Sequence, residues 1–200
     1  MSENFILDFK CPEHRVDGLV DYYYSRKHEH TPGASAFAAN NKPMISQVDK
    51  TIKDSMDLYC YFPYLQENEV FFNYGIHLDH CIESYKAKFD QVINLHKFGA
   101  CEPFVIQKYE KGGGFHKEHF ERSGGNNITI KRVLFWITYL DDVPDGGTIF
   151  RYLNHTEAAV KGKTIISPCD WTHTHCGQIS HTQTKMIATG WLSHLWDFQY

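Results

Sequence analysis

Two overlapping copies of one short pattern lie in a glycine-rich stretch that runs from Gly112 to Gly125. The first copy is His116-Lys117-Glu118 and the second is His119-Phe120-Glu121, so each has the form His-x-Glu. Side chains two residues apart on a β-strand point to the same face, which places an imidazole beside a carboxylate in either copy. Such a pair supplies two ligands for a divalent metal ion. The sequence therefore predicts a metal site, and these residues alone leave both copies as candidates.

A third ligand must come from another part of the chain. A non-haem Fe(II) centre that activates oxygen uses two imidazoles and one carboxylate on one side of the ion, and three positions stay open. The stretch PCDWTHTHCGQ contains two further histidines, His173 and His175, which form a second ambiguous pair. A separate pair, His77 and His80, has no identifiable third partner, and we expect it on the solvated face of a helix.

The elements that must position these residues change character near Gly99. Apolar residues recur every three or four positions over residues 13–25 and 68–95, which predicts two amphipathic helices. Residues 27–46 are rich in Gly, Pro, Ala and Asn and predict a long loop, while residues 46–62 are ambiguous and could end in a strand. After Gly99, runs rich in β-branched and aromatic residues predict about seven or eight strands: FVIQKY, FHKEHFE, ITIKRVLFWITYL, TIFRYL, KTIIS, THTHC and KMIATGWL.

Strands that follow one another without intervening helices favour an antiparallel sandwich or barrel. We expect one α+β, mainly β domain over residues 1–200. Residues 1–99 would supply helical support and loops, and residues 100–200 would form the β core. A hydrophobic content of 42% and an aromatic content of 15% are sufficient for such a core.

Charge and cysteine usage narrow the possible partners and the compartment. The formal net charge is −4 and there is no block of Lys and Arg, which argues against a nucleic-acid partner. No apolar run approaches the roughly 20 residues of a membrane span, and residues 1–15 do not resemble a signal peptide. The six cysteines are scattered without a Cys-x-x-Cys pair, so we expect reduced thiols in a cytoplasmic protein. The oligomeric state stays open.

The order and spacing of several residues between positions 103 and 192 resemble the prolyl 4-hydroxylase-like branch of the Fe(II)/2-oxoglutarate-dependent dioxygenases. In that family a Tyr, a glycine-containing turn and an aromatic residue precede the first metal His, and Tyr109 lies ten residues before His119. A strand that begins with Arg and ends Tyr-Leu-Asp follows, here from Arg132 to Asp141, and then comes Gly-Gly at 146–147. The family's distal His precedes a basic residue by nine or ten positions, as His175 precedes Lys185, and Gly190-Trp191 completes the pattern.

The resemblance implies a role for each matching residue. His119, Glu121 and His175 would hold Fe(II), with Glu at a position where the family usually has Asp. Lys185 would pair with the distal carboxylate of 2-oxoglutarate, with the hydroxyl of Tyr139 close by. Tyr109 would lie near the keto-acid end of this cosubstrate and Trp191 would form a wall of the pocket.

The resemblance also implies the fold and the reaction. The fold would be a double-stranded β-helix of the jelly-roll or cupin kind with supporting N-terminal helices. The activity would couple decarboxylation of 2-oxoglutarate by O2 to hydroxylation of a C–H bond, with ascorbate as a reductant. The expected substrate is a prolyl residue in a peptide or protein. Two alternatives stay open: a nucleic-acid or small-molecule oxygenase of the same superfamily, and a non-catalytic ligand-binding β-barrel, for which the Glu121 departure is the main support.

Overall fold

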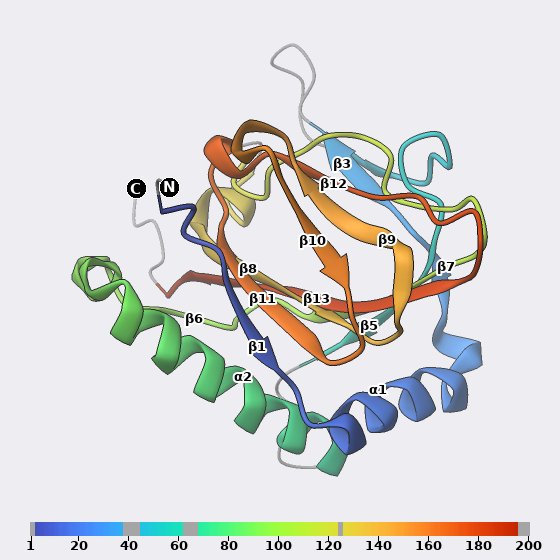
Figure 1. The fold of residues 1–200 in the computed structure, drawn as a ribbon, viewed down its shortest axis with the longest axis horizontal. Helices are drawn as coiled ribbons and strands as arrows, with labels where there is room; N and C mark the ends of the chain where they lie inside the picture. Colours follow the sequence, from blue (N-terminus) through green and yellow to red (C-terminus); the bar gives the residue numbers. More distant parts are fainter. Residues whose placement is uncertain (1–2, 38–44, 62–67, 124–125, 196–200) are drawn as a thin grey trace.

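A computed structural model describes residues 3–37, 45–61, 68–123 and 126–195 of the protein. It contains two long helices, α1 (Glu13–Ser25) and α2 (Glu69–Lys88), which lie below the sheets in Figure 1 and contact each other. The side chain of Asn68 begins α2 by accepting hydrogen bonds from the backbone N–H groups of Val70 and Phe71. Among the described residues, no helix combines the length and the apolar character that crossing a membrane requires.

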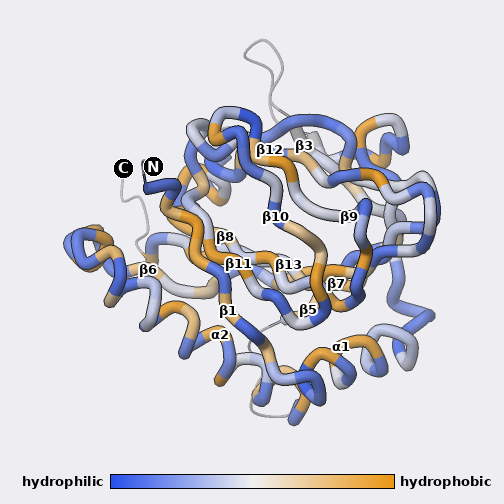
Figure 2. Tube along the Cα trace, in the orientation of Figure 1, coloured by the Kyte–Doolittle hydropathy of each residue, from blue (hydrophilic) through white to orange (hydrophobic). Residues whose placement is uncertain are grey.

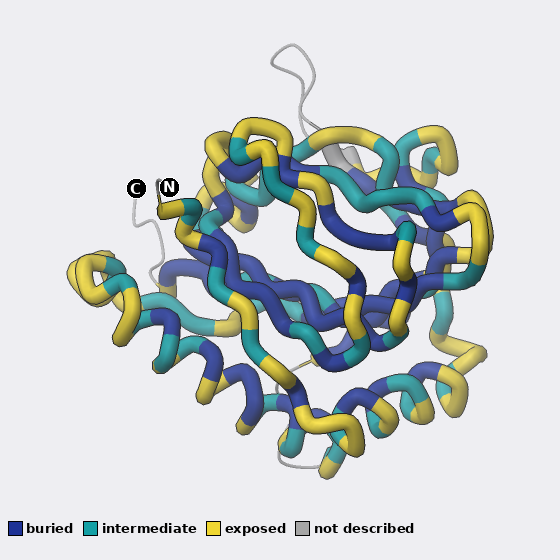
Figure 3. The backbone as a smooth tube through the Cα atoms, viewed as in Figure 1, coloured by how far each residue is buried: buried dark blue, intermediate teal, exposed yellow. Residues whose placement is uncertain are grey.

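The larger sheet is antiparallel and has the strand order β1-β11-β8-β13-β7-β5-β2, with β6 also paired to β13. Its strands are β1 (Leu7–Lys10), β2 (Thr31–Pro32), β5 (Met56–Cys60), β6 (Phe98–Gly99), β7 (Phe104–Tyr109), β8 (Arg132–Tyr139), β11 (Lys163–Pro168) and β13 (Lys185–His194). The central strands β8 and β13 are buried along almost their whole length, because the helices cover one face and a second sheet covers the other (Figure 3). Figure 2 shows hydrophobic residues along both strands, interrupted by polar ones.

The smaller sheet has the order β10-β9-β12, formed by β9 (Val143–Phe150), β10 (His155–Ala159) and β12 (His175–Gly177). A hairpin of β3 (Ser35–Phe37) and β4 (Ile45–Gln47) forms a third, two-stranded sheet. A hydrophobic cluster that includes Phe135, Tyr139 and Ile165 from the larger sheet and Phe150 from the smaller one fills the space between them. The expected mainly β, antiparallel architecture with supporting helices is confirmed.

Several local expectations were right and others were wrong. Helix α1 has the predicted bounds, whereas α2 ends before the predicted residue 95 and is followed by the short 3-10 helix η3 (Asp90–Asn94). Residues 1–99 do not supply only helices and loops, because β1, β2 and β5 join the larger sheet. The segment 27–46 holds β2 and β3 as well as the 3-10 helix η1 (Lys27–Glu29), although residues 38–44 of it lie outside the described residues.

The FHKEHFE segment is not a strand, since its only described ladder contacts are two isolated bridges, from Phe115 to Lys53 and from His119 to His175. Of THTHC, Thr172 and His173 belong to the 3-10 helix η6 (Trp171–His173), and β12 starts only at His175. Strand β10 was not predicted. Its sequence HTEAA is short and largely polar, because only part of it turns inward.

A chain of buried polar groups joins α2 to the larger sheet. Nε2 of His77 lies 2.9 Å from Oγ1 of Thr164, which lies 2.8 Å from Oγ1 of Thr138. Thr138 in turn contacts the Tyr74 hydroxyl at 2.7 Å, and Trp136 Nε1 donates to that hydroxyl at 3.1 Å. His77 is only 4% exposed, so the expectation of a solvated position was wrong for this residue. The hydroxyls of the sheet offer it partners that the sequence pattern of the helix does not show.

The burial of His77 makes stability depend on pH. Burial lowers the pKa of this imidazole to about 4, whereas the unfolded chain takes up the proton near pH 6.5. The folded state thus loses stability as the pH falls from about 6.5 towards 4, by no more than ~3 kcal/mol from this group. We expect the variant His77→Gln, whose side-chain amide can replace the imidazole as a hydrogen-bond partner but cannot titrate, to lose less stability as the pH falls. Urea unfolding at pH 7.5 and pH 5 measures this loss of stability, and His14→Gln, at an exposed position, is the control. Equal declines in wild type and His77→Gln would show that the imidazole is not responsible.

Candidate metal and cosubstrate site

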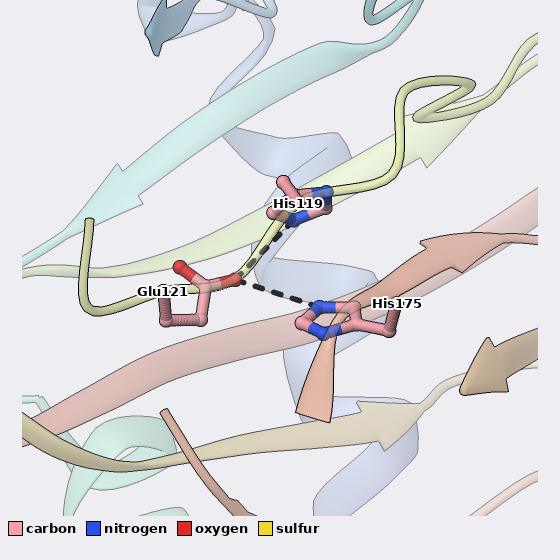
Figure 4. A group of neighbouring side chains, drawn as sticks. All are labelled: His119, Glu121 and His175. Carbon is pink, nitrogen blue, oxygen red and sulfur yellow. Dashed lines mark ion pairs between the residues drawn. The ribbon is translucent and has the colours of Figure 1, made fainter. Parts of the chain in front are cut away.

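His119, Glu121 and His175 converge in the space between the two sheets (Figure 4). One ligand atom from each lies within 4.8 Å of the others. Oε1 of Glu121 is 3.4 Å from Nε2 of His119 and 3.6 Å from Nε2 of His175. The backbones of the two histidines also pair, since each N–H donates to the other's carbonyl at 2.9 and 2.8 Å. This local pairing brings the glycine-rich loop against β12 without a regular strand.

Hydrogen bonds and stacked rings fix the orientation of both imidazoles. Nδ1 of His119 lies 2.9 Å from the carbonyl of Lys117, and Nδ1 of His175 lies 2.9 Å from the carbonyl of His173. A carbonyl only accepts, so each Nδ1 carries a proton, and Nε2 is the nitrogen of each ring that faces Glu121 and could bind a metal ion. His119 stacks on Phe115 at 3.9 Å and 16°, and His175 stacks on Phe135 at 4.7 Å and 16°. A carbonyl bonded to the other ring nitrogen is the usual support of a metal-binding histidine.

The carboxylate of Glu121 is held by its other oxygen. Oε2 accepts hydrogen bonds from Nη1 of Arg132 at 3.0 Å and from the indole Nε1 of Trp191 at 2.7 Å. Although burial raises the pKa of the Glu121 carboxyl, its contacts with His119 and His175 and the charge of Arg132 outweigh this, so the pKa lies well below its usual range. Glu121 is therefore a carboxylate, with Oε2 engaged and Oε1 directed at the imidazoles.

Arg132 is itself anchored on the side away from the histidines. Its Nη2 donates to Oε2 of Glu102 at 2.6 Å, and its Nε lies 3.1 Å from both oxygens of the same carboxylate. Ser193 adds a hydrogen bond to Glu102 at 2.8 Å. The guanidinium also lies over the ring of Trp191, 3.7 Å from its centroid. We call Arg132, Trp191 and Glu102 the Glu121 clamp.

The donor set fits a divalent metal ion such as Fe(II). Two imidazole nitrogens and one carboxylate oxygen face a common point, which is the 2-His-1-carboxylate arrangement. The competing histidine of the second pair is directed elsewhere, because Nε2 of His173 lies 2.9 Å from the carbonyl of Asn4. The geometry thus brings together the three residues that the sequence predicted and leaves His173 out. Their function as metal ligands stays a prediction.

A cavity of ≈ 580 Å³ adjoins this group, and all four predicted cosubstrate residues line it: Tyr109, Tyr139, Lys185 and Trp191. Lys185 is 4% exposed, its Nζ donates to the carbonyl of Gln178 at 2.9 Å, and burial lowers its pKa to about 8. Among the described residues, no carboxylate lies within 4.0 Å of Nζ. A buried ammonium in this position suits an anionic ligand in the cavity.

The two tyrosines have partners of their own in the cavity wall. The Tyr139 hydroxyl donates to Oγ1 of Thr148 at 2.7 Å, and the Tyr109 hydroxyl donates to Oε1 of Gln107 at 2.5 Å. Nζ of Lys185 lies 5.2 Å from the centroid of the Tyr109 ring. The structure therefore places Tyr109 and Lys185 together, and gives each tyrosine hydroxyl a side chain that holds its direction.

Two features of the site were missed by sequence reasoning. The first is the role of Trp191 and Glu102 in holding Glu121 and Arg132. The second is a buried ion pair in the cavity wall, where Nζ of Lys53 lies 2.6 Å from Oδ2 of Asp57. Both involve residues far apart in the sequence or in a segment of ambiguous pattern, so no local spacing identifies them.

The clamp predicts how Glu121 responds to shortening. In Glu121→Asp the carboxylate cannot both keep the hydrogen bonds of Oε2 and reach the imidazoles, so we expect Co(II), used as a substitute for Fe(II), to bind at least ~10-fold more weakly. Glu121→Gln removes the negative charge at nearly constant size and should also weaken binding. Titration of the Co(II) absorption bands measures both, and the exposed neighbour Glu118→Asp is the control. Tighter binding by Glu121→Asp would mean that Glu is a degraded ligand.

No protein-family model and no curated protein sequence matches the chain. Several solved structures do match the chain. A viral collagen prolyl hydroxylase from Paramecium bursaria Chlorella virus-1, solved as a 2OG complex, aligns over 96% of this chain and 97% of its own with a TM-score of 0.64 and 14% identity. A Pseudomonas putida prolyl-4-hydroxylase aligns over 94% and 92% with a TM-score of 0.67 and 14% identity. A Trichoplax adhaerens prolyl hydroxylase, in complex with a hypoxia inducible factor peptide fragment, aligns over 95% and 84% with a TM-score of 0.64 and 13% identity. The resemblance found in the sequence is thus confirmed at the level of the fold: the chain has the double-stranded β-helix fold of the prolyl hydroxylases.

Proposed function

We propose that the chain is an Fe(II)- and 2-oxoglutarate-dependent oxygenase of the prolyl 4-hydroxylase-like family, and that it hydroxylates a prolyl residue in a peptide or protein. The observation that carries the proposal is the meeting of the His119, Glu121 and His175 donors with the buried cation Lys185 around one cavity. The likeness of the fold to prolyl hydroxylases supports it.

Each residue has a physical task in this proposal. A bound Fe(II) would supply the oxygen chemistry that side chains lack. His119, His175 and Glu121 would hold the ion on one side, and the clamp keeps Oε1 of Glu121 directed at it. Lys185 would pair with the distal carboxylate of 2-oxoglutarate, so that each charge offsets the desolvation of the other.

The walls of the cavity complete the proposed site. Tyr109 would border the keto-acid end of 2-oxoglutarate, and Tyr139 would contact its distal carboxylate. Ile137 and Ile187 line the same cavity and would exclude water from the reacting atoms. Ascorbate would act as an external reductant.

A peptide is the favoured substrate among the alternatives. The Trichoplax neighbour holds a peptide fragment, which supports this class of partner. The chain's net charge of −4 favours a peptide over nucleic acid. A non-catalytic binding protein would not need His119, Glu121 and His175 to converge on one point. The cytoplasmic location expected from the sequence stays a prediction.

Turnover of 2-oxoglutarate tests the proposal directly. With Fe(II), 2-oxoglutarate and air, the wild type should form succinate, and His119→Ala or His175→Ala should reduce this to background because two ligand atoms cannot retain the ion in place. His116→Ala, from the other His-x-Glu copy, is the matched control and should keep most of the activity. Succinate formation by the wild type at the background level would refute the proposed enzymatic activity. Loss in His116→Ala but not in His119→Ala would shift the ligand set to the first copy.

The role of Lys185 predicts a separate effect on the cosubstrate. Lys185→Ala leaves the distal carboxylate of 2-oxoglutarate unpaired in a buried site, which costs about 3–5 kcal/mol. The KM for 2-oxoglutarate should therefore rise by about 100-fold or more, while Co(II) binding to the metal ligands is retained. Lys185→Arg should recover part of the loss, and Lys161→Ala on the surface is the control. An unchanged KM in Lys185→Ala would place the cosubstrate carboxylate elsewhere.

A further inference from the structure

His173, the histidine that the proposed metal site leaves out, is buried two residues before His175 and is bonded to a distant segment of the chain. Its side chain is 5% exposed. Its Nε2 donates to the backbone carbonyl of Asn4 at 2.9 Å, across 169 positions, because a carbonyl only accepts. The carbonyl of His173 itself accepts from Nδ1 of His175 at 2.9 Å. One residue therefore connects the start of the chain to the direction of a proposed metal ligand.

The distant segment consists of Asn4, Phe5 and Ile6, which we call the strap. Its backbone turns at Phe5, whose φ of 57° lies in the left-handed region that a bulky side chain rarely adopts. Oδ1 of Asn4 accepts from the N–H of Ile6 at 3.1 Å, which closes the turn around Phe5. A strained backbone of this kind persists only where surrounding contacts hold it, and such positions are frequent at functional sites.

Contacts on two sides hold the strap in place. The hydroxyl of Tyr85, a buried residue of α2, donates to the carbonyl of Phe5 at 2.9 Å. On the other side, Ile6 is 8% exposed and belongs to the hydrophobic cluster between the sheets. That cluster includes Phe135, the ring on which His175 stacks. The strap thus extends from α2 to the side chains that support His175.

We propose that His173 and the strap are positioning residues for His175, because they fix the carbonyl that holds Nδ1 of this imidazole. A partner of this kind sets the orientation of a ligating ring, and its loss lowers the affinity for the metal ion. A hydrogen bond with a structural role alone would change the free energy of unfolding but not the metal affinity of the folded protein. This inference rests on the proposed function, since it concerns a residue that would bind the metal ion.

The Co(II) affinity of two His173 variants tests the inference. His173→Phe keeps a flat ring but cannot donate to Asn4, so we expect Co(II), titrated through its absorption bands, to bind about tenfold or more weakly. His173→Gln, whose side-chain amide can donate to the same carbonyl, should recover most of the affinity. Urea unfolding of each variant measures stability separately. Equal affinity in the wild type and His173→Phe, or an equal loss in both variants, would overturn the inference.

A variant at the far end of the strap gives a second test. Tyr85→Phe removes only the hydroxyl that anchors Phe5, and we expect a loss of Co(II) affinity smaller than that of His173→Phe. Tyr23→Phe is the matched control, because this buried hydroxyl on α1 donates to the carbonyl of Met56 at 3.1 Å, and it should bind Co(II) as the wild type does. Wild-type affinity in Tyr85→Phe, or an equal loss in Tyr23→Phe, would exclude the strap from positioning His175.

A measurement on the metal-free protein separates this inference from the proposed function. The proton on Nδ1 of His175 should give an imidazole N–H signal in nuclear magnetic resonance spectra of protein with isotope-labelled histidine, assigned by its absence from His175→Ala. The signal should persist in His173→Gln and be lost to exchange with water in His173→Phe. These changes in a protein that forms no succinate would refute the proposed enzyme and retain the positioning role. Succinate formation with an unchanged signal in His173→Phe would do the reverse.

Discussion

The ion pair between Glu121 and Arg132 is the interaction on which the rest of the site depends. Both side chains are nearly buried, and a charge in such a place is tolerated only if other groups satisfy it. Arg132 meets this requirement with two carboxylates, Glu121 on one side and Glu102 on the other. Glu121 meets it with Arg132, the indole of Trp191 and the two imidazoles. Removing any partner would leave a buried charge without full compensation in an apolar environment.

The same network accounts for a glutamate in the proposed ligand set. A Glu side chain has one more rotatable bond than Asp and so more conformations to lose on ordering. Here two donors hold Oε2, which leaves Oε1 with one direction. The strand register maintains this arrangement: Arg132 and Ser193 are cross-strand partners of β8 and β13, and both contact Glu102. The position of the proposed metal ligand is thus tied to the pairing of the two central strands.

The cavity contains two buried lysines with different surroundings. Lys53 and Lys185 are each 4% exposed. Lys53 forms an ion pair with Asp57, which also accepts a hydrogen bond from Ser55, so this charge is satisfied inside the protein. Lys185 has a carbonyl and an aromatic face but, in the part of the chain that the structure describes, no carboxylate in contact. The difference separates a cation that supports the wall from one suited to meet an anionic ligand.

The sequence by itself determined helix α1 and the central strands β7, β8 and β13, because an apolar face leaves its period in neighbouring residues. It also determined the ligand candidates and Lys185 through spacing shared with a known family. The structure alone decided the addition of β1, β2 and β5 to the larger sheet and the burial of His77. It also decided the clamp and the pair Lys53–Asp57. These features join residues such as Glu102 and Ser193, 91 positions apart, or Glu121 and Trp191, 70 positions apart. A local pattern states which face of a strand is apolar, but which distant side chains meet depends on which strands become neighbours, and only the folded chain fixes that.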